Sequence, residues 1–223
     1  MSTLVCFALK EEAAPFHKVA AQRPGVFTII VGIGRQNAEK SVRRFLASCS
    51  PELVLTCGFA GGLNPDLKIG DVVFELPLTP SLSSSDGERV AQPGEELSAK
   101  LLAAGAKPVK FFCTDRIATT VAEKKTLREQ TGADAVEMES AAIHAVCAEK
   151  NIPCATVRVV SDTADEALPL DFNALAKADK SLDFGKLAWA IARSPGKIGA
   201  LMALQKKTQL AAQQLAEVLS KIL

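Results

Sequence analysis

The feature that most constrains the fold is the alternation of short apolar runs with segments of helical periodicity. Seven runs have the length and the β-branched content of strands: residues 3–9, 26–31, 52–58, 71–76, 108–113, 133–138 and 154–160. Helix-like segments are residues 11–21, 35–48, 94–104, 121–130, 139–150, 172–192 and 196–222. Strands that alternate with helices predict an α/β fold with a largely parallel sheet covered on both faces.

The length of 223 residues, of which 48% are apolar, suits a single domain with a sizeable core. We expect one domain over residues 1–223, with a helical extension over about residues 176–223. The polar segment 78–96 is rich in Ser, Pro and Gly and is expected to form a surface loop. Lys206, Lys207 and Lys221 are interpreted as a solvated helix face rather than a contact with a membrane or a partner.

Charge and cysteine usage exclude several classes of protein. A net charge of +1 gives no basic field for nucleic acid. Six scattered cysteines, mostly in apolar runs, are typical of buried, reduced thiols, so we expect a cytoplasmic protein. The apolar N-terminal stretch is too short for a signal peptide, and no run approaches the ~20 apolar residues of a membrane span. With two histidines and no clustered cysteines, no metal site is expected.

Acids and glycines follow five of the predicted strands. Their segments are "LKEE" (9–12), "GIGR" (32–35), "GFAGG" (58–62), "VEMES" (136–140) and "VSDTAD" (160–165). Ligands of α/β proteins collect at the carboxyl ends of strands, so these segments are the candidate site.

The two glycine segments each have a functional and a structural interpretation. Gly32 and Gly34 resemble the start of a dinucleotide-binding fingerprint, but Asn37 occupies the third glycine position, so the indication is weak and a tight turn is the alternative. The segment 58–62 lets a ligand approach the backbone closely, with the backbone amides as donors, and a turn is again the alternative.

The acids are likewise open to two interpretations. Glu12, Glu137 and Glu139 can complement helix dipoles, and Asp162 or Ser161 can cap a helix. Taken together, they would bring several carboxylates to one end of the sheet with no matching basic cluster. Carboxylates in that arrangement bind sugar hydroxyls, stabilise a developing cation or donate a proton.

Collinear motifs over residues 3 to about 175 resemble the purine nucleoside phosphorylase/nucleosidase superfamily. The motifs are "ALKEE", "GIGRQNA", "GFAGGLNPDLKIGDVV", "VEMES" and "RVVSDTAD". Within that superfamily, the chain is most similar to the methylthioadenosine/S-adenosylhomocysteine nucleosidases. The segment from "ADEALP" onward is similar to the hopanoid-associated phosphorylases, which act on adenosylhopane.

The resemblance implies a three-layer α-β-α fold with a mixed, largely parallel sheet, and it implies a role for each matching residue. Asp162 matches the acid that protonates adenine N7, and Ser161 helps to hold it. Glu12 matches the residue that activates the water nucleophile. Glu139 matches the glutamate that binds the ribose hydroxyls, Met138 the methionine packed on the sugar, and Glu137 the preceding acid. The remaining substrate contacts fall at Phe59, Ala60, Gly61, Ile117 and Ala118.

Three features depart from the family pattern. Phe59 stands where many nucleosidases have a small hydroxyl residue, and the segment 78–96 is shorter than usual. The arginine that phosphorolytic relatives carry near the glycine segment is missing. Arg35 is either its substitute or an exposed residue at a helix start.

The resemblance implies an enzyme that releases adenine from an adenine nucleoside, because protonation at N7 neutralises a poor leaving group. Burial can raise the pKa of an aspartate so that it carries that proton. Hydrolysis is the expected reaction; phosphorolysis and binding without turnover are the alternatives. No cofactor is expected, with phosphate a co-substrate only in a phosphorylase. The expected partners are the nucleoside and a second copy in a homodimer. Phe59, Phe111 and Phe112 are compatible with a large apolar 5′ substituent.

Overall fold

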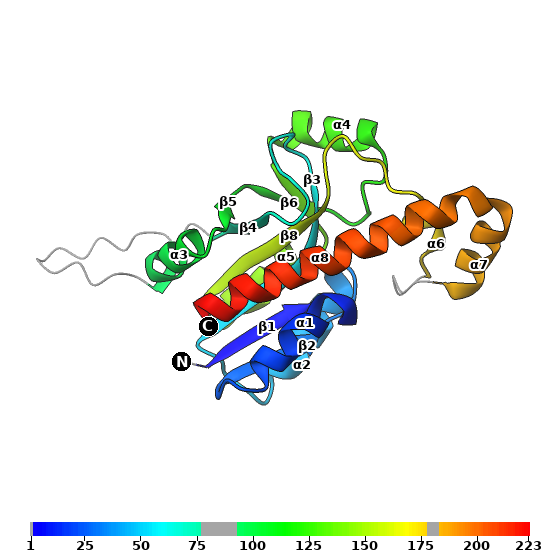
Figure 1. The fold of residues 1–223 in the computed structure, drawn as a ribbon. Helices are drawn as coiled ribbons and strands as arrows, with labels where there is room; N and C mark the ends of the chain where they lie inside the picture. The colour runs from blue at the N-terminus through cyan, green and yellow to red at the C-terminus, as the bar shows by residue number, and fades with distance from the viewer. Residues whose placement is uncertain (1, 77–92, 178–182) are drawn as a thin grey trace, which may run out of the picture.

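The computed structural model describes residues 2–76, 93–177 and 183–223. A single eight-stranded sheet forms its centre (Figure 1). The strands are β1 (Thr3–Phe7), β2 (Val26–Ile30), β3 (Leu53–Gly62), β4 (Val72–Glu75), β5 (Lys107–Pro108), β6 (Phe111–Cys113), β7 (Ala135–Glu137) and β8 (Cys154–Asp162).

The sheet is mixed and mostly parallel, as predicted. Its main path runs β2-β1-β3-β8-β4-β5, and β7 pairs with both β3 and β6. The pairs β1–β2, β1–β3, β3–β8, β4–β5 and β6–β7 are parallel, whereas β4 runs antiparallel to β8 and β7 antiparallel to β3.

The helices are α1 (Lys10–Ala20), α2 (Arg35–Leu46), α3 (Pro93–Ala103), α4 (Val121–Thr131), α5 (Ser140–Glu149), α6 (Phe172–Leu175), α7 (Phe184–Arg193) and α8 (Ile198–Ile222). A short 3₁₀ turn, η1 (Pro195–Lys197), joins α7 to α8.

Strand β1 shows why both faces of the sheet are covered. Val5 and Phe7 pack in one core with α1, α3 and α8, while Leu4 and Cys6 pack in a second core with α2 and α5. Successive side chains of a strand point to opposite faces, and a strand apolar at every position must be buried on both. The predicted three-layer α-β-α fold is confirmed.

The segment 58–62 is strand, so the alternative interpretation of it as a turn is wrong. It forms the second half of β3 and pairs with β8 and β7. The missing side chains let other groups lie against the strand, so the glycines serve packing there instead of reversing the chain.

Two further predicted elements are divided. Residues 108–113 contribute to β5, which pairs with β4, and to β6, which pairs with β7. In place of one helix over 172–192, α6 ends before Ala176, whose ψ of 147° is extended, and α7 begins after the capping residue Asp183. Residues 78–92 of the predicted loop lie outside the described residues, and 93–96 belong to α3.

The last helix has two different halves. From Ala211 onward α8 packs in the core with α1, whereas residues 198–210 hold no buried residue. Figure 1 shows this first half extending away from the sheet toward α7. Lys207 of this half forms an ion pair with Glu166, and its side chain stays 38% exposed. Within the described ranges, no helix is both long and apolar enough to cross a bilayer.

Candidate active site

Glu12 connects the first helix to the central strand. Its Oε2 accepts a hydrogen bond from the Leu9 amide at 2.8 Å, and its Oε1 accepts one from the Phe59 amide at 2.9 Å. The side chain therefore caps the start of α1, as one interpretation predicted, and is also fixed against β3. It is 3% exposed.

The electrostatic surroundings of Glu12 suit a base that works near neutral pH. Burial raises the pKa of Glu12 from 4.5 to about 7, and the carboxylate of Glu139 adds to the rise. The guanidinium of Arg158 and the two backbone amides oppose it. A general base is most effective when its pKa lies near the working pH.

Gly58 makes room for this carboxylate. A Cβ at Gly58 would lie 2.7 Å from Glu12 Oε1 and 2.8 Å from Oε2, closer than real Cβ contacts come. The φ of Gly58 is +143°, which L-residues rarely adopt. Only glycine fits both requirements.

A buried arginine, which the sequence analysis did not foresee, lies at the centre of the acids. Arg158 is on β8 and 1% exposed. Its Nη2 donates to Glu137 Oε2 at 2.6 Å and to Thr56 Oγ1 at 3.0 Å, and lies 3.2 Å from Glu139 Oε2. Its Nε is buried and finds no hydrogen-bond partner among the residues that the structure describes. A charged residue inside the apolar run "CATVRVV" was the signal available in the sequence.

Glu137 holds the arginine and the start of α5 together. Its Oε2 accepts from the amides of Glu139 and Ser140 at 2.9 and 2.7 Å, and its Oε1 accepts from the Ser140 hydroxyl at 2.6 Å. Burial works against its charge, but Arg158 and these hydrogen bonds together lower the pKa of Glu137. The helix-start interpretation thus applies to Glu137, since its carboxylate binds the first amides of α5.

Glu139 faces the glycine turn that precedes α2. Its Oε1 accepts from the Gly34 amide at 2.8 Å. Gly32 and Gly34 both have positive φ, so the tight-turn interpretation of "GIGR" is confirmed and the turn directs an amide at Glu139. Burial and the nearby Glu137 raise the pKa of Glu139, and Arg158 opposes the rise. The neighbouring Met138 is buried with it.

Asp162 ends β8 with both carboxylate oxygens engaged. Oδ1 accepts from the Ser161 hydroxyl at 2.6 Å, and Oδ2 accepts from Lys124 Nζ at 2.5 Å. Ser161 is an extra residue on β8, because the register with β3 steps from the Ala60–Val160 pair to the Gly61–Asp162 pair. This bulge brings the two side chains together. A Cβ on Gly61 would lie 3.4 Å from Asp162 Oδ2, so the glycine segment also borders the second acid.

Lys124, the second buried cation, was also missed. It lies on α4, it is fully buried, and nothing in the sequence separates it from its neighbour Lys125. Arg158 and Lys124 together correct the expectation of acids without basic partners.

The remaining predicted contact residues lie around this centre. Phe59 is half-buried beside the α1–α8 core, and Ala60 is buried in a small cluster with Val160. Ile117 is half-buried and exchanges two backbone hydrogen bonds with the Asn173 side chain, at 2.8 and 2.9 Å, which ties it to α6. Ala118 is buried next to it.

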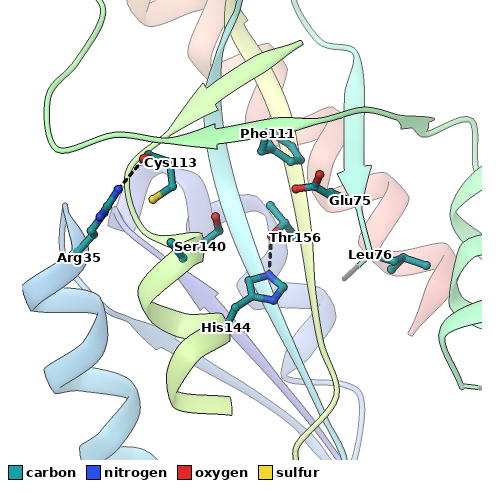
Figure 2. Close-up of a pocket in the computed structure, with 9 residues that line it drawn as sticks. Arg35, Glu75, Leu76, Phe111, Cys113, Ser140, His144 and Thr156 are labelled. Carbon is teal, nitrogen blue, oxygen red and sulfur yellow. Dashed lines mark hydrogen bonds between the residues drawn. The ribbon is translucent and has the colours of Figure 1, made fainter. Parts of the chain in front are cut away.

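A cavity of about 500 Å³ reaches the cluster at Ser140 (Figure 2). His144, on α5, shares a 2.8 Å hydrogen bond with Thr156 of β8 at one side of it. Arg35 of α2 also lines the cavity, where it donates to the Cys113 carbonyl at 2.6 Å and pairs with Asp115 at 3.3 Å. The arginine that contacts the acids is therefore Arg158 and not Arg35.

Comparisons with known proteins show the family to which the chain belongs. A family model described as "Phosphorylase superfamily" matches residues 10–74 and 89–223. The chain belongs to the phosphorylase superfamily. It is 30% identical, over 176 residues, to a 5′-methylthioadenosine/S-adenosylhomocysteine nucleosidase from Shewanella pealeana, a match that covers 70% of this chain and 76% of that protein.

Solved structures share the fold. The futalosine hydrolase of Helicobacter pylori superposes with a TM-score of 0.68 at 20% identity, covering 100% of this chain and 97% of that one. The methylthioadenosine/S-adenosylhomocysteine nucleosidase of Neisseria meningitidis, solved with methylthio-immucillin-A, gives 0.67 at 20% identity over 99% and 97% of the two chains. These likenesses show that the fold is the same. No group of three or more potential metal ligands gathers in the described part of the chain.

Proposed function

We propose that this protein hydrolyses the N-glycosidic bond of an adenine nucleoside. The observation that carries the proposal is the placement of two buried acids, Glu12 and Asp162, against the same glycine segment of β3. A glycosidic bond needs a proton donor for the leaving group and a base for the nucleophile, and the two must flank one substrate.

In this mechanism Asp162 protonates adenine as the bond between adenine and the sugar breaks. The bond between C1′ and N9 breaks, adenine takes the bonding electrons, and N7 receives the proton from the Asp162 carboxyl. Glu12 removes a proton from water as the water oxygen bonds to C1′. General acid or base help of this kind contributes roughly 10²–10⁴ in rate.

The sugar carries positive charge in the transition state, and nearby carboxylates stabilise it. Glu139 binds the ribose hydroxyls and Met138 packs on the sugar. Arg158 and the Gly34 amide fix the Glu139 carboxylate from two sides, so its orientation does not depend on the substrate. Phe59, Ala60 and Gly61 line the nucleoside, with Ile117 and Ala118 beside the base.

The charge balance supports water over phosphate as the nucleophile. The carboxylates of three acids, Glu12, Glu137 and Glu139, all raise the pKa of Arg158. Its guanidinium is the cation that these three acids share. A phosphate dianion would be repelled by the excess of carboxylates. Phosphorolysis remains the second candidate because the buried Nε of Arg158 can donate to an oxygen ligand. A binding module without turnover is the third.

The 5′ substituent is proposed to be methylthio or homocysteinyl, as in the names of the curated relative's substrates. The alternative is an apolar substituent such as that of adenosylhopane, which the sequence similarity of the C-terminal segment suggests. The reaction needs no cofactor. We further propose a cytoplasmic homodimer.

The test is chromatography of the purified protein with methylthioadenosine, S-adenosylhomocysteine and adenosine, each with and without phosphate. Free adenine and free sugar in phosphate-free buffer are expected. Adenine that appears only with phosphate, together with a sugar 1-phosphate, would instead establish a phosphorylase. If none of the three is cleaved but each binds, the binding module replaces the enzyme.

A further inference from the structure

Lys124 donates all three of its ammonium hydrogens to the segment 162–166, which begins with the proposed proton donor Asp162. Its Nζ donates to Asp162 Oδ2 at 2.5 Å, to the Thr163 carbonyl at 2.6 Å and to the Glu166 carbonyl at 2.8 Å. The lysine is fully buried, so no hydrogen is left for solvent. The ammonium is therefore a fixed charge directly beside Asp162.

Stability alone is a poor reason for this arrangement. Removing an ion pair from water costs several kcal/mol per ion, and apolar replacements of a whole buried pair are often as stable. The adjacent Lys125 shows what an ordinary lysine of α4 does, since it is 77% exposed and reaches only Glu129, at 3.9 Å. The cost of burying Lys124 points to an effect on Asp162.

We propose that Lys124 is a positioning residue for the proton donor: its ammonium, together with the Ser161 hydroxyl, holds the Asp162 carboxyl in one orientation. This inference rests on the proposed function, in which Asp162 protonates adenine. Ser161 fixes Oδ1 and Lys124 fixes Oδ2, so the carboxyl cannot rotate without breaking a hydrogen bond.

The other charged groups around the pair do not replace Lys124. Asp165, on the loop after β8, is an acid whose carboxylate accepts from the Thr163 hydroxyl at 2.6 Å. Glu166 of the same loop is neutralised by Lys207 of α8. From β3, Asp162 is faced by Gly61, which carries no charge. Lys124 is thus the cation that contacts Asp162 among the described residues.

The expected effect follows from the hydrogen bonds. Without the Lys124 ammonium, Oδ2 of Asp162 loses this partner, and the carboxyl can rotate about the hydrogen bond that Ser161 still makes with Oδ1. A misplaced catalytic group slows the chemical step, by up to about 10²-fold for a shift of ~1 Å. The loss should therefore fall on kcat and leave KM little changed.

The experiment compares Lys124→Met with Lys125→Met, since both remove one ammonium from α4 and methionine keeps a long side chain without a hydrogen-bond donor. The readout is kcat and KM, measured separately, for methylthioadenosine or for whichever adenine nucleoside the unaltered protein cleaves. We expect Lys124→Met to lower kcat by about 10-fold or more with little change in KM, and Lys125→Met to match the unaltered protein. An unchanged kcat in Lys124→Met, or a change confined to KM, would overturn the proposal.

A second variant covers the case in which Lys124→Met does not fold. Lys124→Arg keeps a cation beside Asp162, but a planar guanidinium cannot present its hydrogens to Oδ2 and to both carbonyls in the geometry of the ammonium. We expect a folded variant with a lowered kcat and little change in KM, and an unchanged kcat in Lys124→Arg would contradict the role of Lys124. Failure of the proposed function looks different: the unaltered protein releases no adenine, or Asp162→Asn retains its activity.

Discussion

Replacing Gly58 by alanine tests the geometry of the proposed base. The new methyl group would meet three atoms of the Glu12 carboxylate at 2.7–2.8 Å. That carboxylate cannot simply shift, because the Leu9 and Phe59 amides hold it at 2.8 and 2.9 Å. It must break the hydrogen bond to Phe59 and turn out of the position that the proposed mechanism requires.

The energies suggest a folded but impaired protein. Losing one hydrogen bond to a charged group costs about 1.5–3 kcal/mol. Alanine at a φ of +143° adds strain of about 1–3 kcal/mol. The sum, about 2.5–6 kcal/mol, is smaller than the ~5–15 kcal/mol stability of all but the least stable domains, so the variant should fold with a lower Tm. Its kcat should drop by roughly 10²–10⁴, the usual contribution of a general base.

Gly105→Ala is the matched control. Gly105 also has positive φ, at +90°, but an added Cβ there has nothing within 4 Å. It should lower the Tm through backbone strain and leave kcat unchanged. The assay is adenine release under saturating nucleoside, with thermal unfolding followed in parallel. Full activity in Gly58→Ala, or an equal loss of activity in Gly105→Ala, would refute the reasoning.

Three further predictions concern the buried charges. Because the pKa of Glu12 is raised from 4.5 to about 7, the folded state binds more protons than the unfolded chain between these values, so Glu12 lowers stability as pH rises through that window. Glu12→Gln should therefore be more stable, relative to the unaltered protein, at pH 8 than at pH 5, and should lose activity. This difference in the free energy of unfolding should reach about 3 kcal/mol and is measured as a higher Tm of the variant at pH 8. In the unaltered protein, kcat/KM should fall as pH drops below about 7, where the base becomes protonated; a flat profile there would speak against Glu12. Arg158→Met leaves Glu137 and Glu139 buried without their cation, and should destabilise the fold by about 3–5 kcal/mol in denaturant unfolding; an unchanged midpoint would show that the pair contributes nothing.

The layers of the fold could be predicted because they follow from local patterns. Leu4, Val5, Cys6 and Phe7 are all apolar, and a strand apolar at every position needs helices on both faces. The glycine segment could not be assigned in the same way. Missing side chains indicate a turn or a close approach equally well, and only the pairing with β8 and β7 decides between them.

The acids of the site were predictable and their cations were not. Glu12, Glu137, Glu139 and Asp162 stand at the ends of predicted strands, where ligands collect. The partners of Arg158 depend on which strands become neighbours, since Thr56 lies 102 residues away along the chain. Lys124 and Lys125 are adjacent residues of the same type. Only the orientation of α4 about its axis determines that the first ammonium is buried and the second exposed.

The most direct test of the proposed function is the rate of adenine release by Asp162→Asn in phosphate-free buffer, measured beside the unaltered protein. Asparagine keeps the shape of the side chain but has no carboxyl proton to deliver. The proposed mechanism predicts a variant that unfolds cooperatively on heating, like the unaltered protein, and still binds the nucleoside, but releases adenine at least about 10²-fold more slowly. Near-normal turnover in that variant would contradict the mechanism.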